Sequence, residues 1–80
     1  MKNNEEYLYV SDLTLASIIS LTFPIVTLDR SNPPRISFLF LHTPALDELV
    51  ARFWRKEITV EPQTFANQIK NLKTRIYSSE

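Results

Sequence analysis

The chain contains no glycine at all. Glycine-rich phosphate loops, dinucleotide-binding fingerprints and nucleophile elbows all need backbone conformations or close approaches that only glycine permits. The sequence therefore excludes most of the familiar nucleotide-dependent enzyme classes.

Cysteine is also absent, and there is a single histidine. This excludes a disulfide framework, a thiolate metal site and a cysteine nucleophile, and an ordinary zinc site is not expected either. Because the chain offers no metal set, no nucleophile with its base and no phosphate loop, we expect a non-enzymatic protein without a metal or cofactor.

Long hydrophobic runs are missing too. No apolar stretch approaches the length that spans a bilayer, and the charged residues 1–6 do not have the pattern of a signal peptide. We therefore expect a cytoplasmic protein without membrane contact. With 80 residues, the chain is expected to form one domain, 1–80, with a frayed end at residues 1–6. A domain this small buries a modest fraction of its surface, so we expect it to gain stability as a homo-oligomer.

Two helices are predicted in the second half of the chain. Thr43 can cap the first, and Pro44 suits its first turn. Its apolar positions recur at helical spacing, which predicts that all of them, Trp54 included, pack in the core. These positions are Leu46, Leu49, Val50, Phe53 and Trp54.

The second of these helices begins at Glu61 and Pro62 by the same logic. The residues between the helices, 58–60, are β-branched, and we interpret them as a short edge strand or an extended link. The apolar stripe of this helix is Phe65, Ile69, Leu72 and Ile76.

The first half of the chain predicts a strand, a helix and a two-strand hairpin. Ser11 or Asp12 caps the helix, and Pro24 ends it. Prolines also mark the turn of the hairpin. The predicted strands are residues 7–10, 25–29 and 35–42.

The last of these strands is expected at the centre of the sheet. Its residues 38–41 are apolar on both faces, as in a strand covered on each side. This gives the strand order 1-3-2, in which strands one and two run parallel and are joined by a right-handed helical crossover. The predicted fold is a small single α+β domain, β-α-β-β-α-(β)-α, with a three-stranded mixed sheet covered by helices.

Several segments resemble a family of short bacterial and archaeal proteins that is catalogued only as a domain of unknown function. The resemblance spans nearly the whole chain and implies an order of elements, but no activity and no catalytic residue. The chain departs from the family pattern at Pro24 and at the Pro33–Pro34 turn. The similar segments are Tyr9-x-Ser11-Asp12-Leu13, Thr43-Pro44 with Leu46, Leu49, Phe53 and Trp54, and Leu72-Lys73-x-Arg75-Ile76-Tyr77.

Charge is unevenly distributed although the net charge is zero. Residues 1–50 carry three basic and six acidic groups, whereas residues 51–76 carry six basic groups and two acidic ones. If the last two helices pack antiparallel, the six cations form a stripe that can follow a phosphate backbone, with Tyr77 and Trp54 available to stack on bases. The alternative is an ordinary solvated face. The candidate nucleic-acid-binding residues are Arg52, Arg55, Lys56, Lys70, Lys73, Arg75 and Tyr77.

The predicted first helix carries no charge after Asp12. It is therefore either deeply buried or half exposed to a partner. The leading hypothesis is an accessory module that self-associates and binds a protein partner, and nucleic-acid binding is the alternative. The candidate partner-binding residues are Leu13, Ile18, Leu21 and Phe23.

Two polar positions have both an ordinary and a chemical interpretation. His42 either satisfies backbone groups at a strand end or acts as a general base with Asp12 or Asp29. The Ser11–Asp12 pair either caps a helix or contributes to an anion site there.

Overall fold

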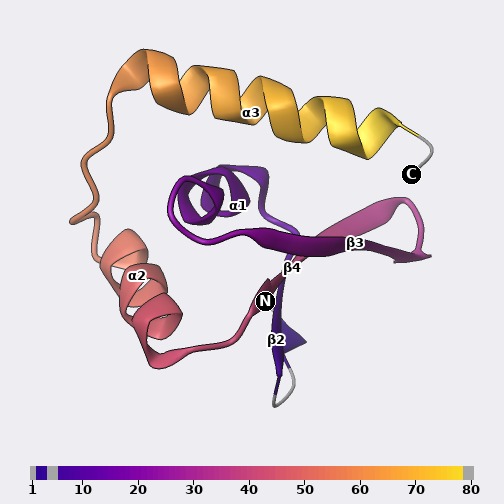
Figure 1. The fold of residues 1–80 in the computed structure, drawn as a ribbon, viewed down its shortest axis with the longest axis horizontal. Coiled ribbons are helices and arrows are strands. Elements are labelled where there is room, and N and C mark those ends of the chain that lie inside the picture. Colours follow the sequence, from indigo (N-terminus) through magenta and orange to yellow (C-terminus); the bar gives the residue numbers. More distant parts are fainter. Residues whose placement is uncertain (1, 4–5, 79–80) are drawn as a thin grey trace.

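The computed structural model describes residues 2–3 and 6–78 (Figure 1). The chain folds as an α+β domain, as predicted from the alternation of its patterns. Its elements are β1 (Lys2–Asn3), β2 (Tyr7–Val10), α1 (Leu13–Ser20), β3 (Ile25–Asn32), β4 (Arg35–Leu41), α2 (Pro44–Trp54) and α3 (Pro62–Tyr77).

The strands form one sheet in the order β1-β2-β4-β3. The predicted central place of β4 is confirmed. Both β2 and β3 are antiparallel to β4, so they run in the same direction, also as predicted. The expectation of a mixed sheet is wrong, because β4 separates the two parallel strands and every neighbouring pair is antiparallel.

Two expectations about short segments change. Lys2–Asn3 forms a short strand, not predicted from the sequence, that pairs with β2, and residues 1, 4 and 5 lie outside the described residues. Residues 58–60 form no strand, so the extended link is the correct alternative. Their side chains face α1 and α2, where they line a hollow away from the sheet.

Helix α1 is shorter than predicted. Asp12 is its cap, because its Oδ1 accepts a hydrogen bond of 2.9 Å from the backbone N–H of Leu15. The helix ends at Ser20, before Pro24, because the next two amides bond back to Ile18 and Ile19 in a tighter turn. Pro24 therefore lies directly before β3 and does not end the helix.

The predicted starts of α2 and α3 are confirmed. Thr43 Oγ1 accepts from the Leu46 amide at 3.1 Å. The Glu61 carboxylate accepts from the amides of Gln63 and Thr64 at 3.1 and 2.7 Å, and from the Thr64 hydroxyl at 2.9 Å. These bonds satisfy amides that have no partner within the first turn of a helix.

The bonds to Glu61 predict a pH dependence of α3. The two Thr64 groups and the Gln63 amide lower the pKa of the Glu61 carboxyl below its ordinary value of 4.5. A lowered folded-state pKa means that the stabilisation is present above the unfolded-state pKa and is lost as pH falls through the folded-state pKa. We expect thermal melts between pH 7 and pH 3 to show a steeper loss of stability for the wild type than for Glu61→Gln. Parallel curves would contradict this role.

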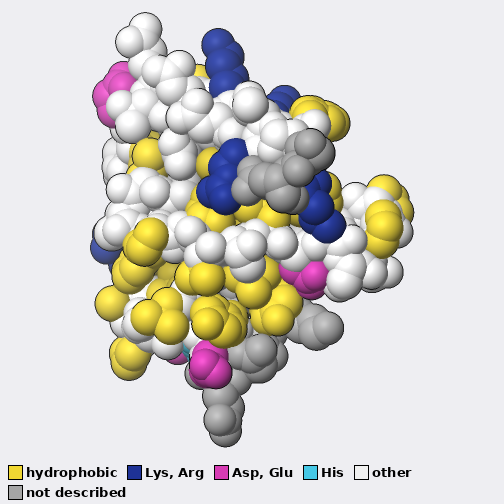
Figure 2. Space-filling view, turned by 45° about the vertical axis from the view of Figure 1, so that its right-hand side comes forward, with side chains coloured by type: hydrophobic (Ala, Val, Ile, Leu, Met, Phe, Trp, Pro, Cys, Tyr) yellow, Lys and Arg dark blue, Asp and Glu magenta, His cyan; other side chains and the backbone are white. Residues whose placement is uncertain are grey.

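All three helices cover the same face of the sheet (Figure 1). The opposite face carries Leu39, which is buried but does not belong to the core cluster, and Leu41, which is 57% exposed. The prediction that β4 is covered on both sides is therefore wrong. Figure 2 shows hydrophobic side chains gathered in the lower half of the face seen in that view.

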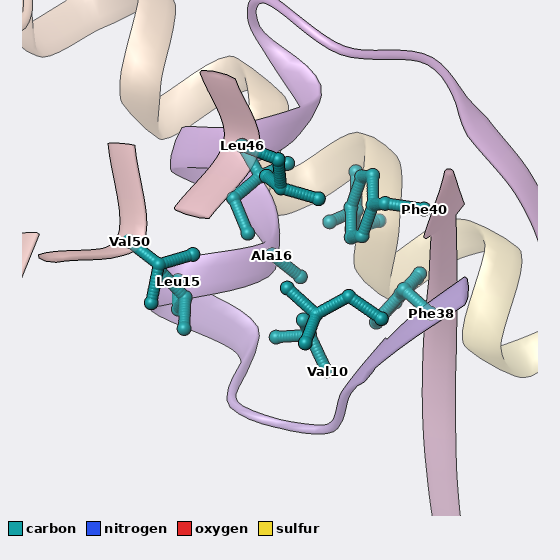
Figure 3. Packing of buried hydrophobic residues seen from close by; sticks show 10 residues of the cluster. Val10, Leu15, Ala16, Phe38, Phe40, Leu46 and Val50 are labelled. Atoms are coloured by element: carbon teal, nitrogen blue, oxygen red, sulfur yellow. The ribbon is translucent and has the colours of Figure 1, made fainter. Parts of the chain in front are cut away.

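The core lies between the helices and the face of the sheet that they cover (Figure 3). The register sets Leu8 opposite Phe40 and Val10 opposite Phe38, which brings these four side chains to one face. Each helix adds at least one fully buried residue. The cluster is Leu8, Val10, Leu15, Ala16, Ile19, Phe38, Phe40, Leu46, Val50 and Leu72.

Ser17 is a polar residue in this apolar interior. It is completely buried, and its hydroxyl has no hydrogen-bond partner in the described structure. An unsatisfied buried hydroxyl costs free energy, and alanine has the higher helix propensity. We expect Ser17→Ala to raise the free energy of unfolding by about 1 kcal/mol, measured as a higher urea midpoint at an unchanged slope.

The matched control is Ser20→Ala. The Ser20 hydroxyl donates to the Ser17 carbonyl at 2.9 Å and accepts from Gln68 of α3 at 2.7 Å. Its removal is expected to lower stability. A destabilised Ser17→Ala variant would show that the Ser17 hydroxyl is satisfied after all.

Candidate functional site

Helix α1 lies between the other two helices. It packs against both α2 and α3, whereas α2 and α3 form no comparable contact with each other (Figure 1). The antiparallel packing of α2 and α3, on which the predicted stripe of cations depends, is therefore wrong.

An apolar groove runs between α1, the end of α2 and the linker that follows it. It consists of two adjoining hollows of about 400 and 250 Å³, which share Ile18 of α1 and Ile58 of the linker. We call this the α1–α2 groove. The first hollow is completed by Thr14, Phe53, Trp54 and Lys56, and the second by Leu21, Thr22, Leu49, Arg52, Thr59 and Val60.

Trp54 forms an outer wall of the groove. It is 58% exposed and meets Phe53 edge to face, with ring centroids 5.0 Å apart. The prediction that Trp54 packs in the core is wrong. Leu46 and Val50 point α2 into the core, and a residue eight positions after Leu46 is rotated about 80° from it on a helix of 3.6 residues per turn. Trp54 therefore leaves the core-facing side of α2.

The predicted partner-binding residues divide into two pairs. Ile18 and Leu21 line the groove, where Leu21 is 37% exposed and Ile18 forms part of the floor. Leu13 and Phe23 are partly buried against the core cluster instead. The structure thus brings only half of the predicted set to this surface.

The turn after α2 brings the linker back to the groove. The amide of Lys56 donates to Phe53 O at 3.0 Å and that of Glu57 donates to Arg52 O at 2.9 Å, which is the Schellman pattern of helix ends. Lys56 stands at the left-handed position of this motif, with φ 61°, where glycine is the usual residue. This conformation sets Lys56 at the edge of the first hollow and sends Ile58 to its floor.

The groove carries positive charge at its rim. Lys56 lines the first hollow and Arg52 lines the second, and both side chains are exposed. No carboxylate lines either hollow among residues 6–78.

A family model described as "Domain of unknown function (DUF5659)" matches residues 5–78. The chain belongs to the DUF5659 family. This confirms the resemblance to an uncharacterised family that the sequence segments indicated. No curated protein and no solved structure gives a significant match. Functional residues of this DUF5659 domain are therefore inferred from its geometry alone.

The six predicted nucleic-acid-binding cations lie in different surroundings. Arg52 and Lys56 border the groove, whereas Lys70 and Lys73 are exposed on α3 and Arg75 is half-buried there. On the face seen in Figure 2, the Lys and Arg side chains are interspersed with other side chains and form no continuous field.

Arg55 is engaged by two carboxylates. Its guanidinium lies 3.0 Å from Glu57 and 3.5 Å from Glu48. The hydrogen bond to Glu57 and the attraction of its charge raise the pKa of Arg55, and the same hydrogen bond is the main cause that lowers the pKa of Glu57. Arg55 is thus less available to a phosphate than the prediction assumed.

His42 has a partner other than those considered from the sequence. Its Nε2 lies 2.8 Å from Oδ1 of Asp47, in the first turn of α2, and not near enough to bond Asp12 or Asp29. Its backbone amide donates to Glu6 O at 2.8 Å. Asp12 serves as the α1 cap, which is the ordinary interpretation of the Ser11–Asp12 pair.

A larger hollow of about 770 Å³ lies at the β3–β4 turn and touches Ile76 of α3. Arg35 is the one charged residue among the described residues that line it.

No group of three or more His, Cys, Asp or Glu that could hold a metal ion occurs among residues 2–3 and 6–78. None of the helices in this part of the chain is long and apolar enough to cross a bilayer.

Proposed function

We propose that this domain is a non-enzymatic interaction module that binds a segment of a protein partner in the α1–α2 groove. The observation that carries the proposal is the groove itself, which combines a floor of Ile18 and Ile58 with an exposed Trp54. A soluble domain that leaves a large aromatic side chain beside an apolar hollow gains free energy when another chain covers it.

The composition of the groove fits recognition of a peptide segment. The first hollow has a size and a mainly apolar lining that are typical of binding sites, whereas the second is smaller and more polar. Tryptophan and arginine are enriched among the residues that dominate interface energies. A cleft between two helices is also a common place for an amphipathic segment to bind. Trp54 and Arg52 border this one on the same helix, α2.

Catalysis is a weaker proposal for this groove. Its titratable lining residues are Arg52 and Lys56, and neither forms a hydrogen bond that would mark a nucleophile with its base. The groove therefore supports binding and not acid–base chemistry.

The small size of the domain favours self-association. A surface other than the α1–α2 groove fits this role better. Two copies meeting through their grooves would bring four cations together, two from each copy. The uncovered sheet face, with Leu41 exposed, avoids this repulsion. Light scattering across a concentration series tests self-association, and Leu41→Glu is expected to reduce it.

Partner binding can be tested with a random peptide library displayed on phage and selected on the immobilised domain. Binding of the enriched peptides is then measured through the fluorescence of Trp54, the single tryptophan of the chain. We expect micromolar affinities that Leu21→Glu weakens at least about tenfold, because a buried unpaired charge opposes binding.

The matched control is Leu41→Glu, which also replaces an exposed leucine but on the sheet face. Circular dichroism checks that both variants are folded. Failure to enrich any peptide, or equal binding by the two variants, would refute the groove as a protein-binding site.

The alternative is nucleic-acid binding through α3. The observation in its favour is that Lys70, Lys73 and the 86% exposed Tyr77 recur at helical spacing on one side of α3. Fluorescence anisotropy with labelled DNA and RNA across a salt series tests it. Binding that weakens linearly in log salt and disappears in Lys73→Glu would support it over the groove.

A further inference from the structure

We infer that the segment that binds the α1–α2 groove is acidic, with two large apolar side chains that fill the hollows and carboxylates beside them. This inference rests on the proposed function and specifies the chemistry of the partner. Each hollow has its own cation at the rim, Lys56 in one and Arg52 in the other. One carboxylate of the partner can therefore accompany each apolar anchor.

The two rim cations have no ion-pair partner among the described residues. Neither Arg52 nor Lys56 forms an ion pair or a side-chain hydrogen bond among the described residues, whereas the nearby carboxylates of Glu48 and Glu57 both pair with Arg55. The charge of Arg52 contributes to the lowered pKa of Glu57, but the ion pair of Glu57 is with Arg55. The positive charge at the rim is left available to an incoming chain, and charge complementarity of this kind selects partners and speeds association.

The backbone at Lys56 supports the same conclusion. A left-handed conformation at a residue other than glycine is costly, and such positions concentrate at functional sites. Here a lysine occupies the position in the helix-ending turn that glycine fills best. The conformation places its charge at the first hollow, next to Trp54.

Other occupants fit less well. A second copy of this chain would bring its own Arg52 and Lys56 against the same cations. Single-stranded nucleic acid supplies negative charge and bases that stack on Trp54, but the floor and far wall are aliphatic, with Ile18, Ile58 and Val60. Aliphatic hollows accommodate leucine-like side chains better than flat bases.

The test uses three labelled peptides that share two leucine anchors and differ only in their flanking residues, which are glutamate, glutamine or lysine. Anisotropy at low salt is expected to give the tightest binding for the glutamate peptide, by about tenfold over the glutamine peptide for two partly exposed ion pairs. Added salt should reduce the difference in affinity between the glutamate and glutamine peptides, because screening weakens the ion pairs and not the apolar contacts.

Reversal of the rim charges provides the complementary arm. Arg52→Glu with Lys56→Glu is expected to weaken the glutamate peptide and to strengthen the lysine peptide. Lys56→Gly removes one charge and suits the left-handed turn, so it should weaken the glutamate peptide while raising the melting temperature. Lys70→Glu, on α3, is the matched control and should change neither affinity.

The outcomes separate the inference from the function on which it rests. Equal binding of the glutamate and glutamine peptides, still lost in Leu21→Glu, would overturn the acidic partner and keep the groove as a protein-binding site. If none of the peptides binds in a way that depends on Leu21, both the acidic partner and the groove as a protein-binding site would be overturned. Competition by oligo(dT) that exceeds competition by the unlabelled glutamate peptide would overturn the acidic segment in favour of nucleic acid.

Discussion

Replacement of Leu72 by alanine is expected to lower the free energy of unfolding by about 3 kcal/mol and to loosen α3 first. Leu72 is 1% exposed and is the one fully buried residue of α3, a helix that the structure describes along its whole length. The loss combines the transfer of the side chain with the cavity that it leaves. For an 80-residue domain, whose total stability is of the order of 4–12 kcal/mol, this is a large fraction.

The measurement is urea unfolding together with amide hydrogen exchange resolved by residue. In the variant, amides of α3 should exchange at a lower opening free energy than those of α2, because Leu72 is the one fully buried residue that α3 contributes to the core. Leu21→Ala, which truncates a leucine that is 37% exposed, is the control and should cost well under half as much. Uniform exchange across α2 and α3 would show that α3 does not open separately.

The starts of the helices could be predicted because they depend on neighbouring residues. Thr43, Pro44 and Pro62 act within one turn, so their effect does not depend on the rest of the fold. The central place of β4 was also evident, because residues 38–41 are apolar in succession. Local signals of this kind are sufficient to define the α+β class.

The faces of the helices could not be predicted as well. Trp54 continues the apolar stripe of α2, but it lies at one edge of that stripe, so Phe53 still packs against the core whereas Trp54 is 58% exposed. Whether a residue at the edge of an apolar stripe is buried depends on which side of the helix faces the core. That orientation is a property of the fold, which the spacing within α2 does not contain.

About half of the groove was within reach of the sequence. The absence of charge in α1 marked Ile18 and Leu21 as a candidate surface, whereas Ile58 and Val60 were interpreted only as an edge strand or link. A signal did exist, because apolar β-branched residues in a connector must be covered by something. Which helices they meet follows from the turn at Lys56, and a glycine-free sequence gives no local mark of that turn.

The contact between Arg30 and the end of α3 is the one that the sequence revealed least, because the partners of Arg30 lie 45 and 46 positions further along the chain. Its guanidinium donates from Nη1 to Ile76 O at 2.9 Å and from Nη2 to Arg75 O at 2.7 Å. The last carbonyls of a helix lie at its negative end, where a cation is favourable. The Arg75 carbonyl also accepts from the backbone N–H and the hydroxyl of Ser78, at 3.3 and 3.0 Å. Arg30 therefore fastens the end of α3 to the edge strand β3.

Arg30→Ala is expected to lower the free energy of unfolding by about 2–3 kcal/mol, because two hydrogen bonds from a charged donor are lost together. Arg30→Lys keeps the charge but cannot reproduce the planar fork, so it should recover part of the loss. Arg35→Ala is the matched control, since Arg35 is exposed in the same hairpin and its side chain forms no hydrogen bond or ion pair among the described residues. Its effect should stay within about 0.5 kcal/mol.

Combination with Leu72→Ala tests whether the two residues hold the same unit. If α3 already opens in Leu72→Ala, then Arg30 has less left to stabilise, and the double variant should lose less than the sum of the single losses. Urea unfolding of the four proteins gives this coupling energy directly. Strictly additive losses would mean that the two contacts act on separate parts of the structure. If Arg30→Ala lowers the free energy of unfolding as little as Arg35→Ala does, the guanidinium does not secure the helix end.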